Sequence, residues 1–489
     1  MYAASAPFPV YDNEEWWKDS WSALDFGREY NPSQTFTEQF KELMNVVPKM
    51  ARVQQGENIN SQYTNCASNN KNCYLIFSSN RDEDCLYGTF VNESKNCLDC
   101  SYTVRSELSY ECIHCDGAYR CRSCRDCISC SDSLYLIDCV GCRNCFGCVG
   151  LRNKEFSIFN EQFTKEEYEK KLSEMSLGSH SLLQTAAKVV QEFILRYPRK
   201  YYIGTQNESV SGDHILHCKN THESFDVEYM EDCKWCVSGQ YMKDAYDISH
   251  YGASGSNELL YECEGVGHTV MQVLFSKLCW GGSSDLLYCY ECFASKNCFG
   301  CIGLRHAEYC ILNKQYSKPE YEKLVPLIIE KMRGSKDWGE FFSPSISPFG
   351  YNETVANEYF PMIPSDVRKY GWNWSNESEK EEQYLGPVHD IPDDISNVSD
   401  EILRAILLCE VTKQPYKIIP QELKFYREMN VPISRKCPSQ RHKERMALRN
   451  PRKLWNRECA KCQKPIATSY SPDRPEIVYC ESCYLETVY

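Results

Sequence analysis

Four cysteines near the C-terminus form the strongest chemical motif of the chain. Cys459 and Cys462 make one Cys-x2-Cys pair, and Cys480 and Cys483 make a second pair after an interval of seventeen residues. Two such pairs present four thiolates to one tetrahedral Zn²⁺, because each tight turn supplies two sulfur atoms. Four protein ligands leave no open coordination position. The spacing therefore predicts a zinc ribbon that holds one structural zinc ion.

A degenerate copy of this motif precedes it. Cys409 and Cys437 have the layout of a second ribbon in which Thr412 and Gln440 replace one cysteine of each pair. Threonine and glutamine are poor zinc ligands. We therefore interpret Cys409 and Cys437 as the remains of a metal site, in which packing against the intact ribbon replaces the energy of the ion.

Most of the 31 cysteines lie upstream, in two cysteine-rich regions. In 121–130 and in 139–148 four cysteines recur at intervals of three. These runs invite an iron–sulfur interpretation or further zinc, but they lack the last spacing and the proline of the ferredoxin pattern. The hypothesis we favour is a structural ladder of reduced thiols, because Cys-x2-Cys spacing without a secretory signal favours a reducing compartment over disulfides.

A mixed metal site is a further alternative in the second cysteine-rich region. Three histidines lie near three cysteines there: His214, His217, His222, Cys218, Cys233 and Cys236. A histidine-rich loop is more often only a loop, so this site is the weaker expectation.

A basic segment separates the two ribbons. Residues 435–457 carry nine Lys and Arg and one acidic residue, within a region, 401–489, that has 17 basic and 10 acidic residues. That balance of +7 leaves −21 for residues 1–400 of the total −14. Rows of guanidinium groups suit phosphates, and an adjacent aromatic ring can stack on a base. The candidate nucleic-acid contacts are Arg441, Arg445, Arg449, Arg452, Lys453 and Trp455. The alternative is that these residues pair with the acidic part of the same chain or with a protein partner.

Catalytic motifs are missing from the sequence. It contains no GxSxG elbow, no Walker lysine motif and no GxGxxG dinucleotide motif. No nucleophile can be singled out among the cysteines. An enzyme of metal or thiol type is the least favoured function.

The cysteines of the first region recur with a period of twelve residues. Between 66 and 148, seven pairs of cysteines are separated by twelve positions, among them Cys73 with Cys85 and Cys100 with Cys112. Short β-prone pieces alternate with Asn, Asp, Ser and Gly. This pattern predicts a narrow β-solenoid whose coils stack about 4.8 Å apart, with cysteine as a small core residue.

The chain also contains a tandem duplication. Residues 144–170 align without gaps on 297–323, with 17 identities in 27 positions. Each copy ends in a capping box, Thr164 with Glu167 and Ser317 with Glu320, which predicts that each cysteine-rich unit runs into a helix.

We therefore predict a mainly β protein with two tandem cysteine-rich β-solenoid-like units, helical connectors and a C-terminal zinc ribbon domain. The expected parts are a Trp-rich segment and helix (1–50), the first solenoid unit (51–163), a helical connector (164–200), the second solenoid unit (201–316), a helix and irregular linker (317–398), and the degenerate plus intact ribbon (399–489). The N-terminal helix is expected at 37–47, ending at Pro48. For Trp16, Trp17 and Trp21 we favour packing against the next unit over a binding surface.

The sequence favours a cytoplasmic protein. No apolar stretch approaches the roughly 20 residues of a membrane span, and residues 1–10 lack the pattern of a secretory signal. We expect no membrane association.

Several distinctive strings resemble an uncharacterised cysteine-rich, zinc-ribbon-containing repeat family of ultrasmall candidate-phylum bacteria. They are WWKDSWSALDFGREYN at 16–31, KNCYL at 71–75, NCFGC in both copies, WGEFF and SPFGYNETVANEYFP within 338–361, and RNPRKLW through SYSPDRPEIVYCESCY within 449–484. The resemblance covers nearly the whole chain. It implies zinc binding and a repeat fold without an established activity.

The function most consistent with these observations is a zinc-binding, non-enzymatic scaffold or interaction protein. One Zn²⁺ site is expected at the intact ribbon, with further metal in the cysteine-rich units as an alternative. The partner is an unknown protein or, if the basic segment contacts phosphates, RNA or DNA.

Overall fold

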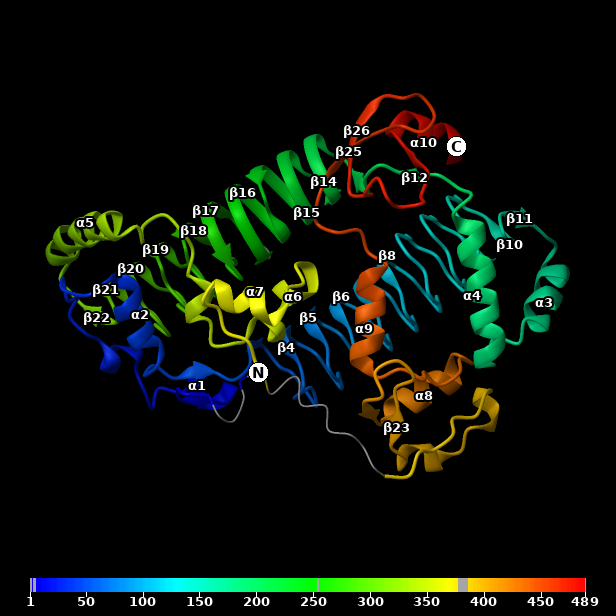
Figure 1. The fold of residues 1–489 in the computed structure, drawn as a ribbon, viewed down its shortest axis with the longest axis horizontal. Coiled ribbons are helices and arrows are strands. Elements are labelled where there is room, and N and C mark those ends of the chain that lie inside the picture. Colours follow the sequence, from blue (N-terminus) through cyan, green and yellow to red (C-terminus); the bar gives the residue numbers. More distant parts are fainter. Residues whose placement is uncertain (1, 3–5, 253–254, 377–385, 489) are drawn as a thin grey trace.

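The computed structural model describes residues 2, 6–252, 255–376 and 386–488. It shows a mainly β protein dominated by a β-solenoid that spans residues 54–311, with helices around it (Figure 1). The segment 159–203 interrupts the solenoid and divides it into a first arm (54–158) and a second arm (204–311). No described helix is long and apolar enough to cross a membrane.

Parallel strands twelve residues apart build the first arm. Thr89 pairs with Ser101 and Ser101 with Ile113, and isolated bridges continue this register through 116–143. The strands are β3 (Gln54–Gln55), β4 (Asn65–Ser68), β5 (Phe77–Asn80), β6 (Thr89–Asn92), β7 (Ser101–Val104), β8 (Ile113–Asp116), β9 (Arg143–Phe146) and β10 (Glu155–Ile158).

The second arm has the same design with a less regular period. Cys298 pairs with Cys310 at a separation of twelve, whereas Met242 pairs with Asn257 at fifteen. Its strands are β13 (Gly204–Thr205), β14 (Glu208–Leu216), β15 (Lys219–Lys234), β16 (Val237–Tyr251), β17 (Asn257–Glu264), β18 (Val270–Leu274), β19 (Ser284–Leu287), β20 (Lys296–Phe299) and β21 (Glu308–Ile311).

Each regular coil turns at four residues with positive φ, one at every third position. In one coil these are Asn72, Leu75, Ser78 and Arg81, with φ between 51° and 57°. The left-handed residues form the corners of a four-sided coil. Each side of the coil is three residues long, and one of its three side chains points inward. Inward positions therefore recur every three residues, which is why the cysteines are spaced as Cys-x2-Cys.

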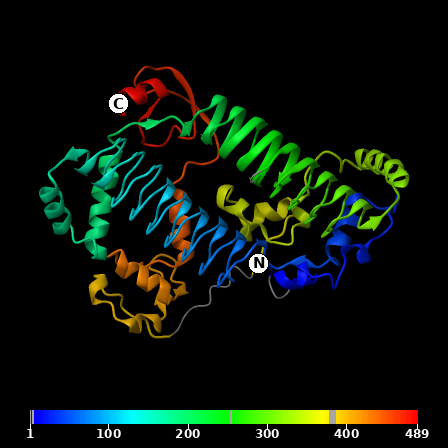
Figure 2. The same cartoon turned by 180° about the vertical axis from the view of Figure 1, so that it is seen from behind.

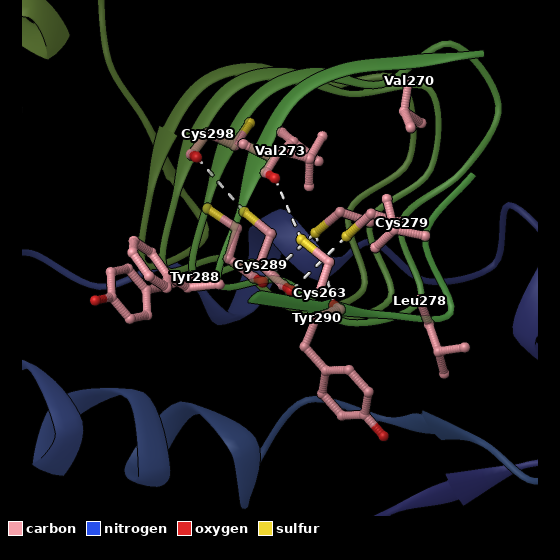
Figure 3. Close-up of a cluster of buried hydrophobic side chains, with 14 of the residues drawn as sticks. Cys263, Val270, Val273, Leu278, Cys279, Tyr288, Cys289, Tyr290 and Cys298 are labelled. Atoms are coloured by element: carbon pink, nitrogen blue, oxygen red, sulfur yellow. Dashed lines mark hydrogen bonds between the residues drawn. The ribbon is translucent and has the colours of Figure 1, made fainter. Parts of the chain in front are cut away.

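The inward cysteines form the narrow core of both arms. The Sγ atom of Cys112 lies 3.6 Å from the carbonyl oxygen of Tyr110 and 3.6 Å from that of Cys121. The same pair of contacts recurs along the ladder. In the second arm, Cys263, Cys279 and Cys289 point into the coil while Tyr288 and Tyr290 point outward (Figure 3). Small, weakly polar thiols fit this narrow interior, which also accommodates buried aliphatic side chains such as Leu136 in the first arm and Val273 in the second.

The duplicated segment forms the far end of each arm. In the first arm β10 turns back into β11 (Glu161–Gln162) and continues into α3 (Lys165–Glu174). In the second arm β21 turns into β22 (Lys314–Gln315) and continues into α5 (Lys318–Ser335). The capping boxes at Thr164 and Ser317 are present, with Glu167 and Glu320 as partners.

The helix that precedes each arm packs on the far end of the other arm. Phe36 of α2 (Phe36–Met44) contacts Phe299 of the second arm, with ring centroids 5.3 Å apart. Phe193 of α4 (His180–Ile194) contacts Phe159, the residue that directly follows the first arm, at 4.9 Å. Gly300 has φ +63°, and a Cβ there would lie 2.6 Å from the Phe36 ring. The glycine of the second NCFGC motif thus makes room for α2.

The N-terminal segment also packs on the second arm. It contains β1 (Val10–Tyr11), α1 (Asn13–Trp17), a 3₁₀ turn (Ala23–Phe26) and β2 (Lys49–Met50), which pairs with β1. Trp16 is fully buried, and its ring lies 5.5 Å from that of Phe293. The tryptophan cluster thus packs against the arm that is more distant in sequence.

The two arms run antiparallel along a shared contact. At one end Phe90 stacks on His250, and one coil farther on the Tyr102 hydroxyl lies 3.2 Å from that of Ser238. The next two contacts along the arms are hydrogen bonds, His114 with Asp226 and Asp126 with His214. Each step of twelve residues forward in the first arm is matched by twelve residues backward in the second. Figures 1 and 2 show the arms from opposite sides.

The remaining elements follow the second arm. They are α6 (Val355–Tyr359), α7 (Pro364–Lys369), β23 (Leu407–Leu408), β24 (Pro415–Tyr416), α8 (Pro420–Glu428), α9 (Pro438–Ala447), β25 (Trp455–Glu458), β26 (Pro465–Thr468), β27 (Val478–Tyr479) and α10 (Glu481–Val488), with short 3₁₀ turns at Pro344–Ile346, Tyr351–Glu353, Ile395–Asn397 and Asp400–Leu403. β27 pairs with β12 (Arg199–Lys200), directly before the second arm. The C-terminal region is therefore attached where one arm ends and the other begins.

Candidate metal centre and the junction of the arms

The four C-terminal cysteines converge. Cys459 and Cys462 lie in the turn between β25 and β26, Cys480 directly precedes α10, and Cys483 lies within that helix. All four Sγ atoms lie within 4.8 Å of one another, and those of Cys462 and Cys480 are 3.6 Å apart. Zn–S bonds of about 2.3 Å in a tetrahedron place sulfur atoms about 3.8 Å apart. The cluster could hold a metal ion such as zinc.

The local backbone favours ionised sulfur at this cluster. Burial opposes ionisation of the Cys459 thiol, yet backbone N–H groups of Cys462 and Cys480 donate to it and lower its pKa to about 6. Burial, followed by the adjacent thiols, raises the pKa of Cys483 to about 12. A bound dication would offset the repulsion between the Cys483 thiolate and the three adjacent sulfur atoms. The four cysteines therefore fit a metal ion.

The degenerate copy shares the backbone geometry of the first knuckle. The backbone N–H of Cys409 donates to Gln414 O at 3.0 Å, as that of Cys459 donates to Lys464 O at 2.9 Å. Lys413 and Gln463 occupy equivalent positions with φ of 60° and 64°.

Cys437 directly precedes helix α9, as Cys480 precedes α10. The Thr412 hydroxyl lies 3.7 Å from Cys437 Sγ. A hydroxyl thus lies where the intact copy has a cysteine. The expected packing against the intact ribbon is wrong: Cys409 and Cys437 are buried among α8 and the first arm, in a different hydrophobic cluster from the four C-terminal cysteines.

The first part of the basic segment is buried against the first arm. Arg441 contacts Asp99 at 3.1 Å and Glu422 at 2.8 Å, and Arg445 contacts Asp99 at 2.6 Å. The Asp99 side chain is completely buried. These contacts agree with the alternative in which the basic segment pairs with acidic residues of the same chain.

The second part reaches the second arm. Arg449 contacts Asp226 at 2.7 Å and lies over the ring of Tyr102 at 4.0 Å. Arg452 contacts Asp226 at 3.3 Å and donates to the Tyr102 hydroxyl at 2.9 Å. Binding of a nucleic acid through these two guanidinium groups would require breaking contacts that join the arms.

Lys453 and Trp455 differ from these arginines. Lys453 is exposed and Trp455 is half-buried, with the ammonium group 5.2 Å from the indole ring. Of the six candidate contacts, Lys453 is the one whose charge faces solvent.

The three histidines and three cysteines of the second region do not meet. Cys218, Cys233 and Cys236 face the core, whereas His214 turns to the first arm and His217 stacks on Tyr229. The four-sided coil separates them, because residues at corners point away from the inward positions. Within the described residues, the groups of three or more metal-ligating side chains close enough to share an ion are the four C-terminal cysteines and His114 with Asp126 and His214. The solenoid thiols are not gathered into such a group.

The junction of the arms is a site that the sequence interpretation missed. His114 and Asp126 belong to the first arm, and His214 and Asp226 belong to the second. His114 Nε2 lies 3.0 Å from Asp226 Oδ1, and His214 Nε2 lies 2.8 Å from Asp126 Oδ1. The twelve-residue spacing of histidine and aspartate in each arm was a usable signal, since it places the two side chains on neighbouring coils.

The two histidines of this junction titrate in opposite directions. Burial, followed by the proximity of His214, lowers the pKa of His114 to about 4. Burial also opposes protonation of His214, but Asp213 and Asp126 outweigh it and raise the pKa to about 9. At neutral pH His214 is a cation and His114 is neutral.

Together, the fold and the cluster define a cysteine-rich β-solenoid protein with a four-cysteine candidate metal centre. No family model and no curated protein matches this chain.

Proposed function

We propose that this protein is a non-enzymatic scaffold in which one structural Zn²⁺, held by Cys459, Cys462, Cys480 and Cys483, fastens the C-terminal region across the two arms. The observation that carries this proposal is the convergence of four sulfur atoms within 4.8 Å of one another. Four thiolates complete a tetrahedron, so the ion would have a structural rather than a catalytic role.

The position of the ribbon supports a fastening role. The Tyr484 hydroxyl of α10 donates to Asp138 of the first arm. Thr468 of β26 donates to the Tyr201 carbonyl, and Ser469 donates to Asp213 of the second arm. A metal that orders these elements would hold both arms to the same short segment.

A scaffold is favoured over a nucleic-acid factor by the buried arginine contacts. Arg441, Arg445, Arg449 and Arg452 are already paired with carboxylates of the chain. Pairing within the molecule satisfies their charge without a phosphate partner.

The test is the zinc content of the purified full chain, measured by native mass spectrometry and elemental analysis. We expect one Zn²⁺ per chain, and its loss in Cys462→Ser and Cys480→Ser. Cys66→Ser, which changes an exposed cysteine outside the cluster, is the matched control and should keep the ion. A wild-type protein without zinc, or one that keeps it after both cluster substitutions, would refute the proposal.

Limited proteolysis tests whether the zinc ion holds the C-terminal region on the arms or binds there without ordering it. Zinc removal should expose 455–488 to cleavage while the solenoid arms stay protected, because the four ligands converge only on one another. Equal protection of the C-terminal segment with and without zinc would show that the ion does not fasten it.

A further inference from the structure

A cavity of about 300 Å³ lies at the junction of the arms. Parts of the chain that are distant in sequence line it: the first arm, α4, β12, the second arm, the segment that follows α9 and the loop between β26 and β27. Their charged side chains are Arg125, Asp126, Arg199, Arg449, Arg474 and Glu476, and His114 and His214 also line it. The volume is at the lower end of the range for small-molecule pockets.

Cationic groups outnumber anionic groups around this cavity, with four arginines against two carboxylates. Arg474 pairs with Glu476, Asp126 with His214, and Arg449 with Asp226 outside the lining. Among the described residues, no ion pair is found for Arg125 or Arg199. Two guanidinium groups thus face the cavity region without a carboxylate of their own.

The contacts of these two arginines are sparse. Arg199 is 8% exposed; its Nη2 donates to Ile194 O at 3.0 Å, and its buried Nη1 has no hydrogen-bond partner in the described part of the chain. Arg125 donates to Leu448 O at 3.4 Å. Burial, followed by the charge of Arg199, lowers the pKa of Arg125, which places the two cations near each other. Asp126 and Glu476 lie close enough to offset part of this charge, but neither forms an ion pair with Arg125 or Arg199 in the described part of the chain. Like charges removed from water without a direct counterion are costly, and an anion between the two guanidinium groups would relieve that cost.

A metal ion is the competing occupant, because ligand atoms of His114, Asp126 and His214 lie within 4.8 Å of one another. The two imidazole rings are stacked, with centroids 3.6 Å apart and planes 21° apart. The nitrogen lone pairs lie in the ring planes, so nearly parallel stacked rings direct them along similar planes rather than toward one ion. The surplus of guanidinium groups also opposes a dication. Both observations favour an anion.

We propose that this cavity binds the phosphate group of a small molecule, with Arg125 and Arg199 as its principal partners. Planar guanidinium groups bind phosphate through paired N–H donors. His214, which also lines the cavity and pairs with Asp126, adds to the positive charge around it. Two unpaired arginines match the double charge of a phosphate better than the single charge of one carboxylate.

Calorimetry and thermal denaturation of the purified full chain test this proposal with inorganic phosphate as the probe. Chloride at equal ionic strength controls for screening, and malonate tests a dicarboxylate. We expect phosphate to bind and to raise the denaturation midpoint beyond chloride. Arg125→Gln and Arg199→Gln should each weaken phosphate binding about tenfold or more, because each removes hydrogen bonds to a charged group. Arg143→Gln, an exposed arginine of the same arm, should bind as the wild type does.

The outcomes are decisive in both directions. The proposal would be overturned if phosphate raised the denaturation midpoint no more than chloride does, or if malonate bound and phosphate did not. It would also be overturned if Arg125→Gln bound phosphate with the affinity of the wild type. If Arg199→Gln perturbs the pairing of β12 with β27 and unfolds, the Arg125→Gln result decides alone, since Arg125 makes its contact at the partly exposed side of the junction.

Discussion

His114 and His214 lie face to face, with ring centroids 3.6 Å apart, although 100 positions separate them along the chain. Each ring also contacts an aspartate of the opposite arm, Asp226 for His114 and Asp126 for His214. The four side chains all lie at left-handed corners of their coils. The corners of the two solenoid arms are therefore where the arms recognise each other.

This junction should make stability depend on pH in both directions. The folded pKa of His214 is raised to about 9, above the ordinary histidine value of 6.5, so its contribution is complete below pH 6.5 and is lost as the pH rises through 9. The folded pKa of His114 is lowered to about 4, so its neutral form contributes above pH 6.5 and that contribution is lost as the pH falls toward 4. The contribution of this pair should be greatest near pH 6.5.

Urea denaturation of the wild type and of His214→Gln at pH 6.5 and pH 9 measures the alkaline side. The variant should lose less stability than the wild type between these two values, because it lacks the titrating group. An identical loss in both proteins would show that His214 does not titrate as described.

Among the carboxylates that pair with arginines, Asp99 should be the one whose replacement lowers the free energy of unfolding most. It is fully buried and pairs with both Arg441 and Arg445. Asp99→Asn leaves two buried guanidinium groups without that charge, and we expect a loss of about 3–5 kcal/mol in the free energy of unfolding.

A matched control is Asp132→Asn. Asp132 makes a partly exposed contact of 3.6 Å with Arg120, for which we expect a loss of about 0–1 kcal/mol. Chemical denaturation should separate the two variants clearly, and equal effects would contradict the structural role given to α9.

At Cys112 the thiol ladder should tolerate a hydroxyl better than a larger side chain. Cys112 is completely buried, and its sulfur contacts the carbonyl groups of Tyr110 and Cys121. Cys112→Ser keeps a donor of similar size and should cost about 1–2 kcal/mol. Cys112→Leu adds volume to a closely packed coil and should cost about 1–3 kcal/mol or more.

Thermal denaturation followed by circular dichroism ranks these variants, with Cys66→Ser at an exposed position as the reference. If Cys112→Leu were as stable as the wild type, the interior would be wider than the ladder implies. A ladder of reduced thiols also predicts a count close to 31 in denaturant after metal removal, since all 31 cysteines are free.

The nucleic-acid hypothesis can be tested at Lys453 without disturbing the junction. Lys453 is exposed, whereas Arg449 is held by Asp226. Lys453→Glu should leave the denaturation midpoint unchanged, and Arg449→Glu should lower it by placing a carboxylate beside Asp226.

Binding of a random RNA pool to both variants, measured over a range of salt, provides the readout. We expect weak binding by the full chain, because the paired arginines are not available to phosphates. Tight, steeply salt-dependent binding that Lys453→Glu reduces would instead support a nucleic-acid partner.

The repeat fold and the four-cysteine cluster were accessible from the sequence because both depend on short-range spacing. The twelve-residue period places Cys298 beside Cys310, and each Cys-x2-Cys pair brings two sulfur atoms together within a single turn. The helix at 37–47 was likewise marked by local periodicity and by Pro48, and α2 occupies Phe36–Met44. The left-handed corner at every third residue was not anticipated, because Leu75 and Arg81 carry no local signal for a positive φ.

The tertiary structure alone decided how the arms and the basic segment meet. Arg449 and Arg452 could pair equally well with a phosphate or with a carboxylate. Nothing in the neighbouring sequence distinguishes these two partners. Asp226 becomes their partner because the second arm folds back antiparallel to the first, which brings it beside the segment after α9. The same folding back encloses Arg125 and Arg199, which are 74 positions apart, around one cavity. Such contacts follow from the burial of whole surfaces, and a periodic pattern within either arm does not encode them.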